Sequence, residues 1–519
     1  MVSTKKRIWK YILSILLILG GNLLIFLAIW MSKKYDQVSL DQFIYQTKAS
    51  AAGANRSLMN SAYIRVGLFG FLLTAGEVLL YLLFNGTLIR LIKQAYPHVK
   101  KAFFVCVRYG TIVGKAVCKF AVRHFLPISA CIAVIAIGYF TIKMNFASYL
   151  YGMFTNSDFI KENYVDPADV ELSFPEKKRN LIYIFLESLE TTFSDPEAGG
   201  YIYDNFMPEL TDLAEKNICF SHDADVGGAK SYYGTTWTAA AMVTQTSGTI
   251  VQVPVTAKNF GNNGNPYMPG LVTIGEVLEK EGYSNTLLFG SDARFANRDV
   301  YFTEHGNYTI LDTESLKAAG RLDPDYRVWW GFEDQKLFEY AKEELTRLAA
   351  EDQPFNLTML TADTHFPNGY VCELCQNEYK KQYPDVVRCS SRQLSAFIEW
   401  IQAQPFYENT TIVLCGDHLT MDPKFMRPVN PEYQRSIYNC IINPAVTPEN
   451  EKFRDYGTFD MYPTTLAALG VEIPGNRLGL GTNLFSSEKT LAEKFGYEYV
   501  NEQFEKKSDF FNEKILGMN

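Results

Sequence analysis

The chain has 519 residues, of which 47% are hydrophobic and 14% aromatic, and this composition excludes general disorder. Its formal net charge of -8 excludes a nucleic-acid partner, because phosphate backbones are bound by clustered lysine and arginine side chains. The length allows more than one folded unit, and the uneven distribution of apolar residues indicates where these units lie.

Three apolar runs near the amino terminus are long enough to cross a bilayer, and they cover residues 8–31, 66–83 and 125–142. The first follows Lys5, Lys6 and Arg7 as a signal peptide would. Its length and the lack of an Ala-x-Ala-like cleavage site instead predict a retained anchor. We therefore expect a transmembrane domain over residues 1–150 that crosses the bilayer several times.

The loop between the second and third runs is strongly basic. Between residues 85 and 124 there is no acidic residue, and the basic ones are Arg90, Lys93, Lys100, Lys101, Arg108, Lys115, Lys119 and Arg123. The positive-inside rule predicts a cytoplasmic loop, with residues 32–63 and everything after the third span outside. An apolar stretch at 102–122 could form a fourth span, but its basic residues favour a helix lying on the inner leaflet.

Glu77 lies inside the second apolar run, where contact with lipid would be costly. Two interpretations are open. The simpler one is a carboxylate that packs against another helix, and the alternative is a functional site within the membrane.

After the spans, residues 151–178 have the prolines and charges of a connector, and a second domain is predicted over residues 179–487. Short apolar runs alternate there with helical patterns, at residues 181–186, 285–290, 357–360 and 411–416. Continuous apolar strands separated by helices predict an α/β fold with a parallel-rich sheet covered on both faces. Residues 488–519 are charged, with Phe and Tyr at helical intervals, and predict a surface helix.

Polar residues follow each predicted strand, at the edge where parallel sheets collect their ligands. They are Glu187 and Ser188, Ser291 and Asp292, Asp363 to His365, and Asp417 and His418. Polar residues often cap the helix after a strand, so each group alone has a structural explanation. Four groups of polar residues at the same edge of the sheet favour a functional site.

Asp417 and His418 place an oxygen and a nitrogen ligand side by side, a combination suited to zinc, manganese or magnesium when another carboxylate joins. Glu187 is the natural third ligand. We expect one divalent cation, with Mn²⁺ ahead of Mg²⁺ or Zn²⁺.

The segment GTTWTAAAMVTQTSG from Gly234 offers a nucleophile. Thr238 would lie in the first turn of a short helix, where the dipole and free N–H groups favour an alkoxide and a bound phosphate. Local sequence does not separate Thr238 from Thr235 and Thr236, any of which could merely cap the helix.

Six motifs in order resemble the lipoteichoic acid synthase and periplasmic-glucan phosphoglycerol transferase group of the sulfatase and alkaline phosphatase superfamily. They are LIYIFLESLE, GTTWTAAAMV, TADTHFP, CGDH, DMYPTTLAALG and NRLGLGTNLFS, between residues 181 and 486. The resemblance implies an alkaline phosphatase-like fold, a multi-span anchor and an outward-facing catalytic domain.

Carried over by motif, the resemblance implies metal ligands at Glu187, Asp417 and His418 and a threonine nucleophile on the metal. The spacing of ten residues to Gly248 selects Thr238 for this role. His365 matches the substrate-binding histidine and Arg298 the phosphate-contacting arginine. Lipoteichoic acid synthase carries a bulky aromatic residue where this chain has Ala296, so the acceptor stays open.

The implied reaction moves phosphoglycerol from phosphatidylglycerol to a hydroxyl of an envelope glycan or polyglycerolphosphate, through a phospho-threonine. Alternatives that share the site are a phosphoethanolamine transferase and a phosphodiester hydrolase. A catalytically silent envelope-binding protein conflicts with the intact set of Glu187, Thr238, Asp417 and His418.

Three of the nine cysteines, Cys372, Cys375 and Cys389, lie in one predicted external segment. A zinc site would want a fourth ligand, and the sequence offers none nearby. In an oxidising compartment we expect a disulfide that uses Cys389, with the pairing left open, and free thiols are the alternative.

Overall fold

The computed structural model describes residues 2–35, 40–54, 56–85, 87 and 119–518. The chain divides into two compact units, Met1–Lys34 with Arg56–Ser148, and Tyr35–Asn55 with Tyr149–Asn519. Most of the basic loop, with the helix predicted at 102–122, lies outside the described residues. The two units are described separately below.

The first unit is helical. It contains α1 (Val2–Lys34), α3 (Arg56–Ala62), the π-helical η1 (Tyr63–Leu68), α4 (Phe69–Phe84) and α8 (Phe125–Lys143). Three helical segments of the described chain are long and apolar enough to cross a membrane: Ile8–Lys34, Arg56–Phe84 and Phe125–Lys143. The second begins before the predicted residue 66, because the helix continues into a polar turn that hydropathy alone does not mark.

Glu77 lies on α4 and faces α1. The side-chain nitrogen of Asn22 donates to Glu77 Oε2 at 2.7 Å and to Thr74 Oγ1 at 3.0 Å. A polar pair between two apolar helices satisfies groups that would be costly in lipid. Of the two interpretations of Glu77, the helix-packing carboxylate is the one that these contacts support.

The second unit is built on a seven-stranded sheet with the order β2-β7-β6-β1-β5-β3-β4. The strands are β1 (Asn180–Leu186), β2 (Gly228–Ala229), β3 (Ser284–Phe289), β4 (Thr309–Leu311), β5 (Phe355–Leu360), β6 (Thr410–Gly416) and β7 (Ile437–Ile442). The five from β6 to β4 are parallel, whereas β7 and β2 pair antiparallel at one edge. The predicted α/β fold and its four predicted strands are confirmed.

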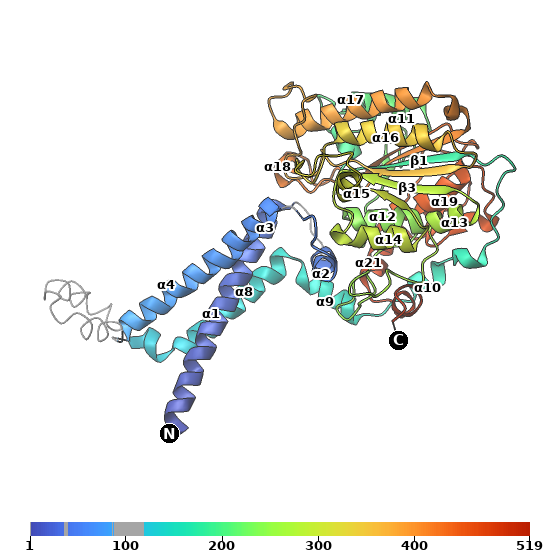
Figure 1. The fold of residues 1–519 in the computed structure, drawn as a ribbon. Coiled ribbons are helices and arrows are strands. Elements are labelled where there is room, and N and C mark those ends of the chain that lie inside the picture. Colours follow the sequence, from blue (N-terminus) through green and yellow to red (C-terminus); the bar gives the residue numbers. More distant parts are fainter. Residues whose placement is uncertain (1, 36–39, 55, 86, 88–118, 519) are drawn as a thin grey trace. The chain divides into compact units, whose positions relative to one another are not determined.

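Helices cover both faces of this sheet (Figure 1). On one face lie α11 (Pro208–Lys216), α16 (Asp334–Leu348) and α17 (Gln382–Gln402); on the other lie α12 (Thr238–Ser247), α13 (Ile274–Lys280), α14 (Arg298–Glu304) and α19 (Met461–Ala468). Alternate residues of β1 supply both cores: Ile182 and Ile184 pack with the first group, Tyr183 and Phe185 with the second. Burial on both faces explains why this strand is apolar throughout.

Residues 35–55 connect the first two membrane-length helices in sequence but fold into the second unit. Their helix α2 (Leu40–Lys48) inserts the fully buried Tyr45 into the core with Trp237 and Phe260. The Lys48 side chain donates to the carbonyls of Val255 and Ala257, both at 2.6 Å. This segment is therefore part of the α/β unit, which the sequence did not indicate.

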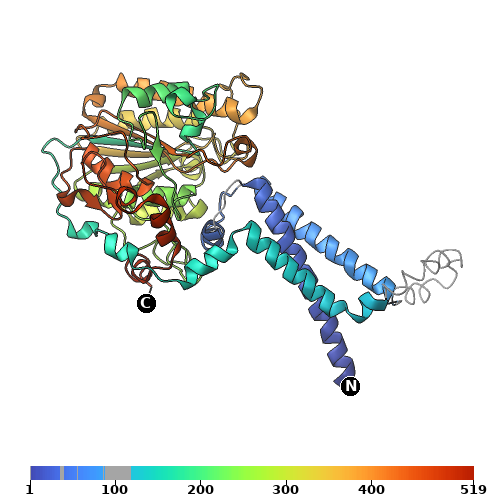
Figure 2. The same ribbon diagram turned by 180° about the vertical axis from the view of Figure 1, so that it is seen from behind.

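The carboxyl-terminal residues form two short helices, α20 (Leu491–Phe495) and α21 (Tyr497–Glu505), and the π-helical η9 (Phe511–Ile515). Phe504, Phe511 and Ile515 are fully buried in the core shared with α12 and α19. Figure 2 shows this segment, in dark red, beside that face of the sheet. The single surface helix predicted for residues 488–519 is thus wrong, because the segment forms several short helices and buries Phe504 and Phe511 in the core.

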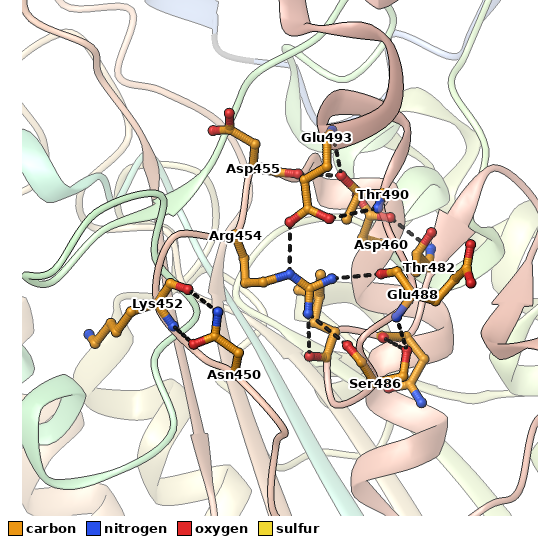
Figure 3. A network of polar contacts seen from close by, with 12 residues as sticks. Asn450, Lys452, Arg454, Asp455, Asp460, Thr482, Ser486, Glu488, Thr490 and Glu493 are labelled. Carbon is orange, nitrogen blue, oxygen red and sulfur yellow. Dashed lines mark hydrogen bonds and ion pairs between the residues drawn. The ribbon is translucent and has the colours of Figure 1, made fainter.

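Arg454 fixes the start of this tail through a buried polar network (Figure 3). Its guanidinium pairs with Glu493 at 2.7 Å and donates to the carbonyls of Leu484, Ser486 and Glu488. In the same region, the Asp460 carboxylate accepts from the backbone N–H of Gly457 and of Thr482. The conspicuous Asp460 motif therefore has a structural role, joining the start of α19 to β9 (Gly481–Thr482).

Candidate active site

Glu187 and Asp417 lie side by side because their strands are neighbours in register. β1 pairs with β6 so that Leu186 lies opposite Gly416, and the next residue of each strand is a carboxylate. Gly416 is required there, since a Cβ atom would lie 2.1 Å from the Leu189 carbonyl oxygen. Parallel pairing thus brings together two acids that are 230 residues apart in sequence.

Glu187, Asp417 and His418 form a buried cluster whose ligand atoms lie within 4.8 Å of one another. His418 Nε2 is 3.4 Å from Asp417 Oδ2 and 3.7 Å from Glu187 Oε1. His418 Nδ1 lies 2.9 Å from the Leu419 carbonyl, which holds a proton on Nδ1 and leaves the Nε2 lone pair facing the carboxylates.

Backbone amides hold one oxygen of Asp417 and leave the other without a partner. Oδ1 accepts from the N–H groups of Ser188 and His418, both at 2.7 Å. Oδ2 is buried and has no hydrogen-bond partner among the described residues. A buried anionic oxygen without a donor is costly unless a cation meets it.

The electrostatics of the two carboxylates also favour a bound cation. Burial, and then the charge of Asp417, raise the pKa of Glu187 well above its ordinary value. Two adjacent buried carboxylates beside an imidazole lone pair suit a divalent cation, which compensates both charges. The residues present therefore fit a metal site.

Thr238 is the first residue of α12 and points at this cluster. Its Oγ1 lies 3.3 Å from Glu187 Oε2 and 3.3 Å from His418 Nε2. The helix is fixed to the strand ends by Gln245, whose amide nitrogen donates to the Gly416 carbonyl at 2.9 Å. Thr238 is only partly buried, whereas the three residues of the cluster are buried.

The other two threonines are held elsewhere. Thr235 is fully buried, and its hydroxyl donates to the Tyr232 carbonyl at 2.8 Å and accepts from the Tyr232 N–H at 3.1 Å. Thr236 Oγ1 is buried and has no partner among the residues that the structure describes. Of the three candidates, Thr238 is the one that contacts the cluster.

Arg298 begins α14 and is buried with its charge directed at backbone and hydroxyl groups. Its guanidinium donates to the Asp292 carbonyl at 2.8 Å and to Ser291 Oγ at 3.0 Å, and lies over the Phe289 ring. Burial lowers the pKa of Arg298 to about 10, so the side chain still carries its charge at neutral pH. A buried cation of this kind suits an anionic substrate group.

His365 follows β5 and lies near His418 and Arg298. Burial, with smaller contributions from His418 and Arg298, lowers the pKa of His365 to about 4. Its Nδ1 contacts the Phe366 carbonyl, which leaves Nε2 as the free nitrogen. At neutral pH this imidazole is uncharged and able to accept a proton.

Three supporting residues were not predicted. Glu190 pairs with Arg435 at 2.5 Å and accepts from the Thr420 N–H, which anchors the loop after His418. Its place in the LESLE motif was a usable signal. The Trp330 ring packs edge-on against the His365 ring, with ring centroids 4.8 Å apart. The adjacent tryptophans Trp329 and Trp330 were a usable signal in the sequence. Tyr45 gave no signal.

Comparison with known proteins identifies the family. The family model described as Sulfatase matches residues 179–471. Phosphoglycerol transferase I of Escherichia coli (strain 55989 / EAEC) is 32% identical over 354 residues, covering 64% of this chain and 43% of that protein. The Salmonella choleraesuis protein of the same name is 32% identical over 343 residues, covering 64% and 42%. The chain thus spans less than half the length of these relatives.

Among solved structures, the lipoteichoic acid synthase LtaP from Listeria monocytogenes matches with a TM-score of 0.47 and 18% identity, covering 63% of this chain and 80% of that one. A Vibrio parahaemolyticus protein of the alkaline phosphatase superfamily matches with a TM-score of 0.46 and 21% identity, covering 63% and 76%.

The parallel-rich sheet, with acidic and imidazole groups at its strand ends and a threonine at a helix start, defines an alkaline phosphatase-like α/β domain. The chain belongs to the sulfatase family, whose model covers more than half of it. The resemblance inferred from the six sequence motifs is confirmed.

Proposed function

We propose that this chain is a membrane-anchored, metal-dependent transferase that moves phosphoglycerol from phosphatidylglycerol to an acceptor hydroxyl of an envelope glycan or polyglycerolphosphate. The observation that carries the proposal is the contact of the Thr238 hydroxyl with both Glu187 and His418, at 3.3 Å each. The choice of donor follows the curated relatives, which are named phosphoglycerol transferase I.

Glu187, Thr238, Asp417 and His418 would hold one divalent cation, with Mn²⁺ proposed ahead of Mg²⁺ and Zn²⁺. The partnerless Asp417 Oδ2 and the free His418 Nε2 support this ligand set. When bound, the cation supplies positive charge that lowers the pKa of the threonine hydroxyl and stabilises phosphoryl oxygens.

In the first half-reaction the Thr238 oxygen attacks the phosphorus of the donor. The new bond joins Thr238 to phosphorus, and the bond to the diacylglycerol oxygen breaks. Diacylglycerol leaves as an alcohol, with the proton that Thr238 lost. His365, uncharged at neutral pH, carries this proton, and Arg298 faces the non-bridging oxygens.

In the second half-reaction an acceptor hydroxyl attacks the glycerophospho-threonine. The acceptor oxygen bonds to phosphorus, the bond to Thr238 breaks, and the acceptor's proton returns to the threonine. Thr238 lies at the start of a ten-residue helix. This position favours both the threonine alkoxide and the bound phosphate, because free N–H groups of the first helical turn point at the negative charge.

The anchor suits a lipid donor, because it keeps the catalytic domain of residues 179–487 near the head groups. Residues 35–55 belong to the same unit as the residues after 149, which supports an outside location for both. With the amino terminus and the basic loop in the cytoplasm, the three helices of 1–150 would cross the membrane and 151–178 would lead outward.

A head-group competition assay tests the proposal against its alternatives. The full-length chain in detergent receives phosphatidylglycerol or phosphatidylethanolamine, each with a labelled head group, together with a native envelope fraction and divalent metal. Labelled acceptor formed from phosphatidylglycerol, in the same amount as the diacylglycerol released, supports phosphoglycerol transfer. Free glycerophosphate as the main product would indicate a hydrolase, and transfer only from phosphatidylethanolamine would indicate a phosphoethanolamine transferase.

A further inference from the structure

A second group of metal-ligating side chains lies outside the candidate active site. Cys372, Cys375 and Cys389 place their sulfur atoms within 4.8 Å of one another. Cys372 Sγ is 3.6 Å from Cys375 Sγ and 3.7 Å from Cys389 Sγ, and all three thiols are unbonded. The disulfide expected at Cys389 is therefore not found, because the fold gathers three sulfurs at one point rather than two.

Two separate segments build this thiol cluster. Cys372 and Cys375 lie in the loop after β5, on a tight turn in which the Cys375 N–H donates to the Cys372 carbonyl at 3.2 Å. Cys389 projects from α17. Cys372 and Cys389 are buried, so the cluster is largely shielded from solvent.

The Gln393 side chain lies beside two of the three sulfur atoms. It lies one helical turn after Cys389, and its amide nitrogen is 3.4 Å from Cys389 Sγ and 3.6 Å from Cys372 Sγ. Its Oε1 is buried and has no partner among the described residues. Rotation of the amide group by 180° exchanges its nitrogen and oxygen and turns Oε1 toward the sulfurs.

We propose that Cys372, Cys375, Cys389 and Gln393 form a zinc site, separate from the active-site metal. Thiolates arranged tetrahedrally about Zn²⁺ at about 2.3 Å lie about 3.8 Å from one another, close to the separations seen here. A disulfide needs about 2.05 Å and would leave the third thiol over. The spacing of Cys372 and Cys375 is that of structural zinc sites.

The site would fasten the loop that carries His365. This loop runs from the end of β5 to the start of α17, and the zinc ion would tie its middle to that helix. Cys389 and Gln393 also line a surface cavity of about 400 Å³, which gives the ion an entry path. Four protein ligands close the coordination shell, so the role is structural.

Metal analysis of the full-length protein in detergent, after growth with zinc and gel filtration, tests the proposal. Asp417→Ala serves as the background because it removes the active-site ion. We expect one zinc per chain in this background and in Asp417→Ala/Cys440→Ser, whose buried thiol lies outside both clusters. The double variant Asp417→Ala/Cys389→Ser should lose this zinc ion.

Zinc that is unchanged by Cys389→Ser would overturn the proposal. So would an unreduced intact mass about 2 Da below the reduced one, which would show a disulfide. X-ray absorption at the zinc edge of the Asp417→Ala protein gives a reading that does not depend on the cysteine variant folding. Three sulfur neighbours with one oxygen or nitrogen support the site, and a shell without sulfur contradicts it.

Discussion

The Tyr45 hydroxyl donates a hydrogen bond to the backbone carbonyl of Ala296 at 2.6 Å, two residues before Arg298. Ala296 and Asn297 both have positive φ, a conformation that costs energy in non-glycine residues. The Ser50 carbonyl, from the same segment as Tyr45, accepts from the Ala296 N–H at 3.0 Å. Residues 35–55 thus hold the strained turn that presents the candidate phosphate-binding arginine.

Tyr45→Phe should lower kcat/KM for transfer several-fold, because the turn before Arg298 loses its tether, and should cost about 1 kcal/mol of stability. Tyr340→Phe is a matched control, since Tyr340 donates to the Arg321 carbonyl at 2.8 Å. It should cost similar stability and leave turnover unchanged. Equal effects of the two variants on turnover would show that Tyr45 acts only through stability.

Reporter fusions test the predicted topology. A fusion after Lys119 should report a cytoplasmic location and one after Lys178 an external location, because the basic loop is retained inside. A fusion after Ser50 should be external too, since residues 35–55 fold with the catalytic unit. Activity of both alkaline phosphatase and fluorescent reporters should be measured at each position. An external signal after Lys119 would contradict the three-span topology.

Protonation of His365 should destabilise the protein in acid. Its pKa is about 4 when folded and about 6.5 when unfolded, so the unfolded chain binds more protons between these values. Stability is therefore lost as the pH falls from 6.5 toward 4, by up to about 3 kcal/mol. His365→Gln should flatten this part of the stability profile. The free energy of unfolding should be measured by denaturant at several pH values, for chelated, metal-free samples of both proteins. Identical pH dependence of the two proteins would refute the lowered pKa of His365.

The parts of the molecule that sequence predicted well are those governed by local pattern. Apolar runs marked β1, β3, β5 and β6, and polar residues after them marked one edge of the sheet. The choice among Thr235, Thr236 and Thr238 rested on the family spacing, whereas the structure separates them by their contacts.

The parts that sequence missed depend on contacts between distant segments. The attachment of Tyr45 to the turn at Ala296 joins residues 251 positions apart and has no local signature. The charges of the tail predict a surface helix, although Phe504 and Phe511 bury their rings. The contact of Gln393 with the cysteines has no local signature either, because a lone glutamine is rarely a metal ligand.

Removal of one ligand should empty the proposed active-site metal position. Asp417→Ala and His418→Ala should each lose the bound active-site ion and nearly all turnover, while the domain stays folded. Asp422→Ala is the control, because Asp422 is buried nearby but caps the helix α18 (Pro423–Met426). It should keep the metal at a cost of about 1 kcal/mol. Turnover by a chelated, metal-free wild-type sample would contradict the metal dependence.

The central claim is that Thr238 carries the phosphoglycerol group. Thr238→Ala should lose nearly all transfer, and Thr235→Ala and Thr236→Ala should keep substantial activity. Thr235 only bridges backbone atoms of Tyr232, so its loss should mainly lower stability, by about 1 kcal/mol.

Rapid acid quenching of the wild-type enzyme with labelled phosphatidylglycerol and no acceptor, followed by peptide mapping, tests this claim most directly. We expect one glycerophosphate adduct, on Thr238, with diacylglycerol released in equal amount. An adduct on Thr235 or Thr236, or full transfer by Thr238→Ala, would contradict it.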